Sequence, residues 1–247
     1  MNDDLTMAEL VRNGTMSAAM AATLWAAVDE GVSFITVAVP QNAGKSTTAN
    51  AVLQLRPPGV LLHPVADEPE RLERLKQERV GGYLVVGEFS PRGARRGYIW
   101  GAPVQRVFDT LTAGYSLQSS LHAPSAIDGM HEITHGNGVS DERAAQLGLV
   151  LYIEMFGSWQ DPGVRRRLVD LYELHSVERG EPIGQSLFRW RRSDDSFEQL
   201  SEPRRFGRDA SDLRERATII AGLAESGGTS TPDLEDAMAG YRAGARR

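Results

Sequence analysis

The stretch SFITVAV, residues 33–39, runs directly into PQNAGKST, residues 40–47. The first part is short and rich in β-branched residues, which is typical of a strand buried on both faces. A helix that carries Val52 and Leu53 is expected to begin at Gly44. Upstream, Ser17 is a candidate cap for a helix that ends near Gly31. The sequence therefore predicts a helix, a buried strand, a tight turn and a second helix.

The turn fits the phosphate-binding pattern G-x-x-x-x-G-K-[ST], except that Val39 replaces its first glycine. In such a loop the backbone N–H groups hold phosphates, Lys45 reaches the β and γ oxygens, and Ser46 ligates Mg²⁺. Asn42 tolerates positive φ better than most residues with a Cβ, and it is expected to stand in for a glycine. Lys45 and Lys76 are the only lysines in the chain.

A bare GKST also occurs at exposed helix starts, but the strand before it and the helix after it favour a phosphate-binding loop. The predicted nucleotide-binding residues are Pro40, Gln41, Asn42, Ala43, Gly44, Lys45, Ser46 and Thr47.

A second candidate lies where the apolar run Tyr83 to Val86 ends in Gly87 and Glu88. The Glu88 carboxylate is placed to polarise an attacking water or to hold Mg²⁺ through water. Its alternative interpretation is a solvated glutamate at a strand end.

Apolar runs and helical patterns alternate along much of the chain, which predicts an α/β domain with a largely parallel sheet. Strands are expected at residues 59–62, 83–86, 115–119, 149–155 and 165–174, and helices at the segments EPERLERLKQER, 104–111 and 127–133. We predict one domain over residues 1–203, followed by a short helical tail over residues 204–247. The run Arg165-Arg166-Arg167 is interpreted as a solvated strand end or an interface feature.

Composition limits the classes of protein. The 247 residues carry a net charge of −6, which argues against broad nucleic-acid binding, and the chain contains no cysteine. No apolar run approaches the roughly 20 residues that span a bilayer, and the start lacks the order of a signal peptide. A cytoplasmic location is expected.

Residues 10–197 resemble the ATPase domain of the type II/IV secretion and pilus-assembly ATPases, nearest to the archaeal and Tad-type branch. Glu88 in VVGEF is similar to the family's catalytic glutamate, although Ser90 replaces the arginine that follows it. The segment AGYSLQSSLHAPSA resembles the family's His box, with His122 as the matching histidine. The order of these segments along the chain matches that of the family.

The resemblance implies a RecA-like P-loop core that binds ATP and Mg²⁺, with Lys45, Glu88 and His122 as catalytic residues and Ser46 and Glu88 at the metal. His122 would contact or sense the γ-phosphate. The resemblance also implies a hexamer that works with platform proteins at the inner membrane, and a separate chain in place of the family's amino-terminal domain. The alternative is a degenerate, non-catalytic nucleotide-binding subunit that partners a complete ATPase.

A competing metal motif lies at His131-Glu132-Ile133-Thr134-His135, which matches the H-E-x-x-H pattern of zinc peptidases. Asp141 would supply a third ligand and Met155 a following Met-turn. The alternative is a surface helix whose histidines are solvated. Zinc catalysis is the less favoured hypothesis, because this segment follows the His box, where the resembled family has an ordinary helix.

Overall fold

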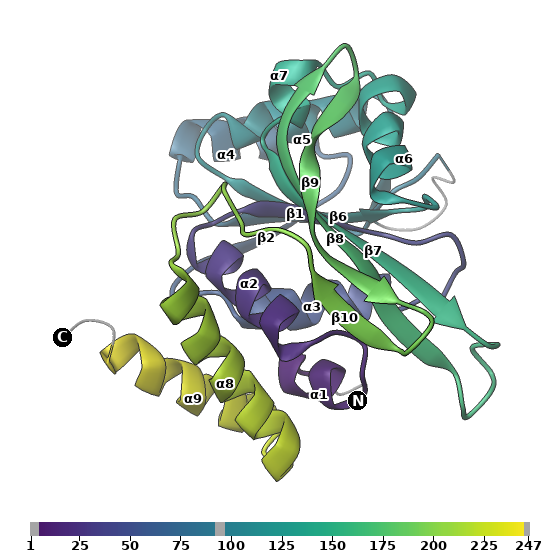
Figure 1. Ribbon diagram of the computed structural model, residues 1–247. Coiled ribbons are helices and arrows are strands. Elements are labelled where there is room, and N and C mark those ends of the chain that lie inside the picture. Colours follow the sequence, from purple (N-terminus) through teal and green to yellow (C-terminus); the bar gives the residue numbers. More distant parts are fainter. Residues whose placement is uncertain (1–4, 92–96, 245–247) are drawn as a thin grey trace.

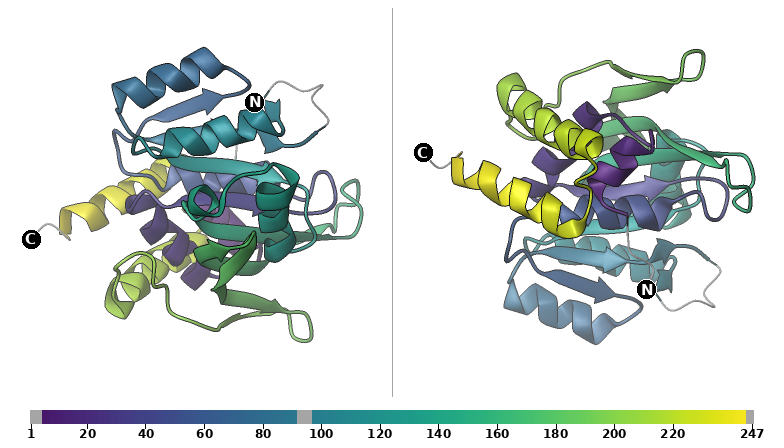
Figure 2. Two further views of the ribbon diagram at one scale, coloured as in Figure 1. Left: turned by 90° about the horizontal axis from the view of Figure 1, so that it is seen from above. Right: turned by 90° about the horizontal axis from the view of Figure 1, so that it is seen from below.

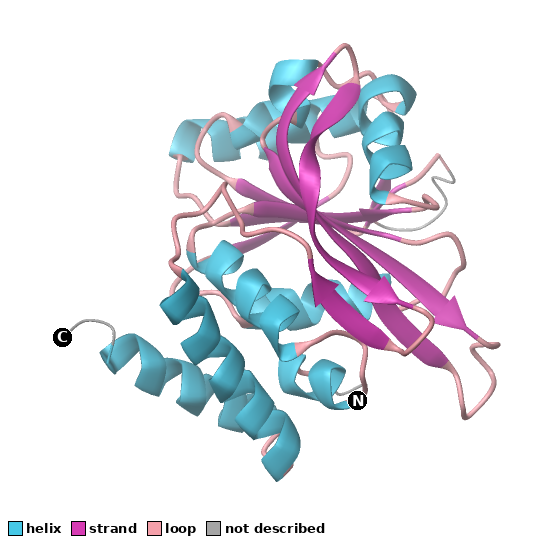
Figure 3. Cartoon of the chain, in the orientation of Figure 1, coloured by secondary structure: helices cyan, strands magenta, loops and turns pink. Residues whose placement is uncertain are grey.

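The computed structural model describes residues 5–91 and 97–244, in which a single sheet lies between two layers of helices (Figure 1, Figure 3). The strands that have parallel neighbours are β1 (Ser33–Val37), β2 (Leu62–Val65), β3 (Tyr83–Val86), β4 (Glu88–Phe89), β5 (Tyr98–Ile99), β6 (Ser116–Leu121) and β7 (Leu147–Phe156). An antiparallel extension consists of β8 (Arg165–Glu178), β9 (Glu181–Arg191) and β10 (Ser196–Gln199).

Helices cover both faces of this sheet, as the two further views confirm (Figure 2). One face carries α1 (Met7–Arg12), α2 (Ala18–Asp29), α3 (Lys45–Gln54), α8 (Ala210–Ser226) and α9 (Thr231–Gly244). The other face carries α4 (Pro69–Glu78), α5 (Ala102–Leu111), α6 (Ala126–His131), the π-helix η1 (Glu132–Gly136) and α7 (Asp141–Ala144).

Strand β1 occupies the middle of the sheet, whose order is β10-β9-β8-β7-β1-β6-β3-β2. Every residue of β1 is buried, and its side chains alternate between the two faces. Phe34 joins the core under α2, whereas Ile35 and Val37 join the core under α5. The predicted α/β class with a mostly parallel central sheet is thus confirmed.

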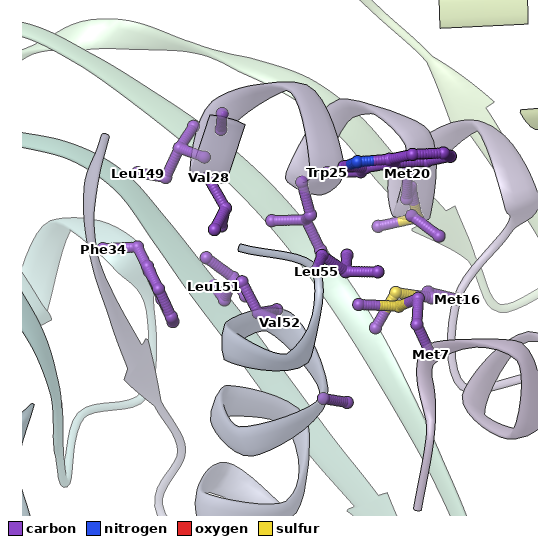
Figure 4. Close-up of a cluster of buried hydrophobic side chains, with 14 of the residues drawn as sticks. Met7, Met16, Met20, Trp25, Val28, Phe34, Val52, Leu55, Leu149 and Leu151 are labelled. Carbon is purple, nitrogen blue, oxygen red and sulfur yellow. The ribbon is translucent and has the colours of Figure 1, made fainter. Parts of the chain in front are cut away.

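The core under α2 and α3 holds the first helices against the sheet (Figure 4). In this view Phe34 from β1 and Leu149 and Leu151 from β7 lie beside Val28 of α2 and Val52 of α3. Ser17 caps α2 by accepting a hydrogen bond from the Met20 amide, as its sequence position predicts. The element order around the glycine-lysine turn is therefore the expected one.

The strand predicted at residues 59–62 is wrong, because β2 begins only at Leu62. Gly59 takes a positive φ of 89°, and the Val60 amide donates to the Pro57 carbonyl, so this segment is a turn. Strand β2 lies at the edge of the sheet, where Pro64 is tolerated because the edge needs no further N–H donor. Helix α1 was not predicted; the reciprocal capping box of Thr6 and Glu9 is the signal that marks its start.

The carboxyl-terminal helices share the core of the domain: Ile220 of α8 and Leu234, Met238 and Tyr241 of α9 belong to the same cluster as Trp25. The boundary at residue 203 stays a prediction. No helix in the part of the chain that the structure describes has both the length and the apolar character needed to cross a membrane.

A buried arginine fastens this helical pair to α2. The Arg216 side chain is 1% exposed, and it donates to Asp29 at 2.6 Å and to Asp212 at 2.9 Å. Its guanidinium carbon lies 4.7 Å from the ring centre of Trp25 and 4.6 Å from that of Tyr241. The guanidinium is therefore neutralised by two carboxylates and packs against two rings that also contact each other.

We predict that Arg216→Ala lowers the free energy of unfolding by about 3–5 kcal/mol, because it leaves the Asp29 carboxylate buried with one partner fewer. Urea titration measures this change. Arg214→Ala, an exposed arginine on the same helix, is the matched control and should change the free energy by less than about 0.5 kcal/mol. Equal free energies of unfolding for the two variants would contradict the role of Arg216 in holding the carboxyl-terminal helices against α2.

Candidate nucleotide-binding site

The loop between β1 and α3 has the backbone shape of a phosphate-binding turn. Asn42 takes φ = +63° and Gly44 takes φ = +99°, and α3 begins at Lys45. The expectation that Asn42 stands at a positive-φ position is confirmed. Val39, the residue in place of the first glycine, does not take a positive φ, and its side chain is 56% exposed. The loop therefore accommodates valine at that position without backbone strain.

The amino terminus of α3 opens into a cavity of about 590 Å³, a volume within the range of small-molecule sites. Among the described residues no side chain caps α3, and the first amides of a helix have no partner within it, so they suit the binding of an anion. The cavity is lined by Gln41, Asn42, Ala43, Gly44, Lys45, Ser46, Thr47, Glu88, Ser90, Tyr98, His122 and Arg166. Pro40 belongs to the loop but is not one of these residues, and its role stays a prediction.

The three predicted catalytic side chains converge in this cavity from three elements. Lys45 Nζ lies 3.7 Å from Glu88 Oε2 and 3.4 Å from each ring nitrogen of His122. His122 Nε2 lies 3.2 Å from Glu88 Oε1. Lys45 comes from the start of α3, Glu88 from β4, and His122 follows β6 directly. The structure thus brings together residues that are far apart in the sequence.

Burial shapes the electrostatics of this group. The Lys45 and Glu88 side chains are each 8% exposed. Loss of hydration lowers the pKa of the Lys45 ammonium, and the nearby Glu88 carboxylate opposes that decrease. The ammonium and the carboxylate consequently form a buried ion pair at the floor of the cavity.

His122 also ties the start of the loop to the neighbouring strand. Its Nδ1 lies 2.8 Å from the carbonyl oxygen of Val39. A carbonyl only accepts hydrogen bonds, so Nδ1 is the donor in this contact. The histidine therefore contacts the loop backbone through one nitrogen and faces Glu88 through the other.

The residues proposed for Mg²⁺ have the donor atoms that this ion prefers. Ser46 is exposed in the first turn of α3, and its hydroxyl lines the same cavity as the Glu88 carboxylate. Mg²⁺ binds oxygen ligands and is usually held by one or two protein groups together with substrate phosphates and water. Within the described ranges no three His, Cys, Asp or Glu residues form a metal-binding group.

Sequence reasoning missed Ser90, Tyr98 and Arg166 among the lining residues. Arg166 comes from β8, and its Nε and Nη2 atoms donate to the Asn42 carbonyl at 3.2 and 3.1 Å. The interpretation of residues 165–167 as a solvated strand end is wrong for Arg167, which is buried and paired with Asp195, and the interface alternative stays a prediction. The arginine run was the available signal, but a run of like residues does not show which one faces the loop.

The residues of the H-E-x-x-H segment do not assemble a zinc site. His131 lies at the end of α6 and Glu132 to Gly136 form a π-helix, so the segment is not one regular helix. The proposed third ligand, Asp141, accepts hydrogen bonds from the amides of Arg179 and Gly180 at 2.6 and 2.9 Å. His131 contacts Glu181 at 2.9 Å.

The proposed Met-turn residue, Met155, lies inside strand β7 rather than in a turn. The described residues thus supply neither the third ligand nor the Met-turn that the zinc hypothesis names.

No protein-family model matches the sequence, and no curated protein matches it. Among solved structures, the chain is similar to the VirB11 ATPase from the Brucella suis type IV secretion system in complex with sulphate, with a TM-score of 0.44, 16% identity, and coverage of 70% of this chain and 57% of that chain. It is also similar to the Legionella pneumophila ATPase DotB, with a TM-score of 0.44, 9% identity, and coverage of 65% of this chain and 51% of that chain. The chain thus matches little more than half the length of either protein.

The backbone at Asn42 gives a direct test of the loop geometry. We predict that Asn42→Ala lowers the free energy of unfolding by about 1 kcal/mol, because a positive φ is energetically less favourable for alanine than for asparagine. Asn42→Gly adopts this conformation without strain and should stay within about 0.5 kcal/mol of the wild type. Urea titration of the three proteins decides this, and an alanine variant as stable as the wild type would contradict the prediction.

Proposed function

We propose that this chain binds ATP with Mg²⁺ at the cavity beside α3 and hydrolyses it. The observation that carries the proposal is the convergence of Lys45, Glu88 and His122 at a helix amino terminus that no side chain caps. A buried cation beside the backbone amides at a helix amino terminus binds phosphates, and a carboxylate in the same cavity can accept a proton from an attacking water.

Each residue of the cavity then has a role in binding. The amides at the start of α3 and the Lys45 ammonium hold the β- and γ-phosphates. The Ser46 hydroxyl holds Mg²⁺ directly, and Glu88 holds it through water. When bound, Mg²⁺ neutralises charge that develops on the phosphate oxygens.

In the reaction, a water oxygen bonds to the γ-phosphorus while the bond from that phosphorus to the β–γ bridging oxygen breaks. The products are ADP and inorganic phosphate, and the Glu88 carboxylate accepts the proton that the water loses. Nε2 of His122 lies 3.2 Å from Glu88 Oε1, so the imidazole stands beside the carboxylate and is placed to contact the γ-phosphate. Proximity and charge stabilisation supply most of the acceleration in phosphoryl transfer.

At the level of the cell, we assign this activity to the motor subunit of a type II/IV secretion or type IV/Tad-like pilus-assembly system. The support is the ordered resemblance of the loop, the VVGEF segment and the SLHAPSA segment to that family. A hexamer that works with platform proteins at the inner face of the cell membrane follows from the same resemblance.

A second candidate is a nucleotide-binding subunit that does not hydrolyse ATP and that partners a complete ATPase. Two departures favour it: Val39 in place of the first loop glycine, and Ser90 in place of the arginine after the catalytic glutamate. Binding is common to both candidates, so turnover separates them.

The first test concerns binding. We predict that Lys45→Ala removes measurable Mg²⁺-dependent ATP binding, because the phosphates lose the buried ammonium that faces them. Lys76→Ala is the matched control: this other lysine lies on α4, outside the cavity, and its removal should leave the affinity unchanged. Isothermal titration calorimetry measures both. Unaltered ATP affinity in Lys45→Ala would refute the assignment of the loop.

The second test concerns turnover. We predict that Glu88→Gln keeps the ATP affinity of the wild type but lowers the turnover rate by about 100-fold or more, because glutamine cannot accept the proton. Initial rates of phosphate release are measured at protein concentrations that permit assembly, with Glu78→Gln, an exposed glutamate on α4, as the control. A wild type that binds ATP without turnover would favour the second candidate.

A further inference from the structure

Arg166 reaches the phosphate-binding loop from a distant part of the chain. It lies at the start of β8, opposite Met155 of β7, and its side chain extends to the loop that follows β1. Nε and Nη2 donate to the Asn42 carbonyl at 3.2 and 3.1 Å. These two residues are 124 positions apart in the sequence, so the contact is a product of the tertiary fold.

The arginine stem also packs on the second positive-φ residue of the loop. A Cβ added to Gly44 would lie 2.9 Å from Cδ of Arg166. The side chain therefore covers Gly44 and bonds to Asn42, the two residues whose backbone shapes the turn. This packing fixes the guanidinium at the mouth of the cavity.

The guanidinium retains donors for a ligand. Arginine has five N–H donors, and the contact with Asn42 engages one on Nε and one on Nη2. Across the described residues, the Arg166 side chain makes no other hydrogen bond or ion pair, and it lines the cavity. The remaining N–H groups are thus available to a ligand in the cavity that Lys45 also lines.

The charge balance of the cavity depends on this residue. Of the lining residues, Lys45, Glu88 and Arg166 carry formal charges when His122 is neutral. Lys45 and Glu88 form an ion pair and cancel each other. Among the described lining residues, Arg166 therefore makes the net charge positive, which favours the negatively charged complex of ATP and Mg²⁺.

The neighbouring arginines do not share this position, because side chains alternate along a strand. Arg167 is buried and makes a two-point hydrogen bond to Asp195 at 2.7 Å, and Arg165 lies 3.6 Å from the same carboxylate. Only the middle residue of the run faces the loop.

We propose that Arg166 is a second phosphate-binding cation of this site, which contacts the terminal phosphates of the nucleotide through its remaining N–H groups. The assignment rests on the proposed nucleotide-binding function. A guanidinium suits this role because it stays charged at every physiological pH and matches phosphate oxygens with a planar fork of donors. Burial lowers the pKa of the Lys45 ammonium. A nearby arginine therefore contributes a positive charge that does not depend on the protonation of Lys45.

The experiment compares the wild type with Arg166→Gln, Arg166→Lys and the control Arg165→Gln. The affinities for ATP and for tripolyphosphate, both with Mg²⁺, are measured by calorimetry over a range of NaCl concentrations. Arg166→Gln should weaken both ligands by about 10- to 100-fold and reduce the dependence of affinity on salt. Arg166→Lys should recover part of the loss, and Arg165→Gln should behave as the wild type.

Each other outcome overturns the assignment in a recognisable way. If Arg166→Gln binds both ligands as the wild type does, while Lys45→Ala does not bind, Arg166 contacts no phosphate although the nucleotide site stands. If lysine rescues nothing and the salt dependence is unchanged, Arg166 only supports the loop through Asn42. If the wild type itself binds neither ligand, the proposed function fails together with the assignment. Urea midpoints of all variants confirm that the fold is retained.

Discussion

The parallel pairing of β1 with both of its neighbours is the constraint on which the site depends. β1, β6 and β3 run in the same direction. Their carboxyl ends therefore lie along the same side of the sheet, which is where ligands of open α/β sheets bind. The glycine-lysine loop leaves β1 at that edge, His122 follows β6 there, and β4 continues from β3 to place Glu88. A reversed β6 would carry its histidine to the opposite edge and leave the ammonium and the carboxylate without it.

The antiparallel half of the sheet adds a further side chain to the site that the parallel strands form. The β7–β8 hairpin returns the chain to the loop, where Arg166 contacts Asn42. Farther along β8, the fully buried Glu173 accepts hydrogen bonds from the amides of Arg204 and Arg205. This buried carboxylate fixes the segment that leads from the sheet to α8, and the outer helices are thereby anchored to the strand that supplies the loop contact.

Two buried ion pairs in this chain serve different purposes, and their surroundings distinguish them. Arg216 and Asp29 are almost fully buried, and the guanidinium packs against the rings of Trp25 and Tyr241, so the pair holds helices together. Lys45 and Glu88 are equally buried but line an open cavity. Desolvation makes each pair costly to break, and of the two only the second lines the cavity to which we assign the nucleotide.

Local physics allowed the sequence by itself to determine the segment from β1 to α3. β-branched residues form the strand, glycine and asparagine permit the positive φ values, and the helix starts at Lys45; each depends on neighbouring residues only. Local signals failed near Gly59, where the apolar run begins in a turn and the strand starts only at Leu62, and at His131 to His135, where the metal motif meets no third ligand among the described residues. Only the tertiary structure decided that Glu88 and His122 meet Lys45 and that Arg166, rather than Arg165 or Arg167, faces the loop. Strand order and register fix those contacts across long separations in the chain, and no local pattern encodes them.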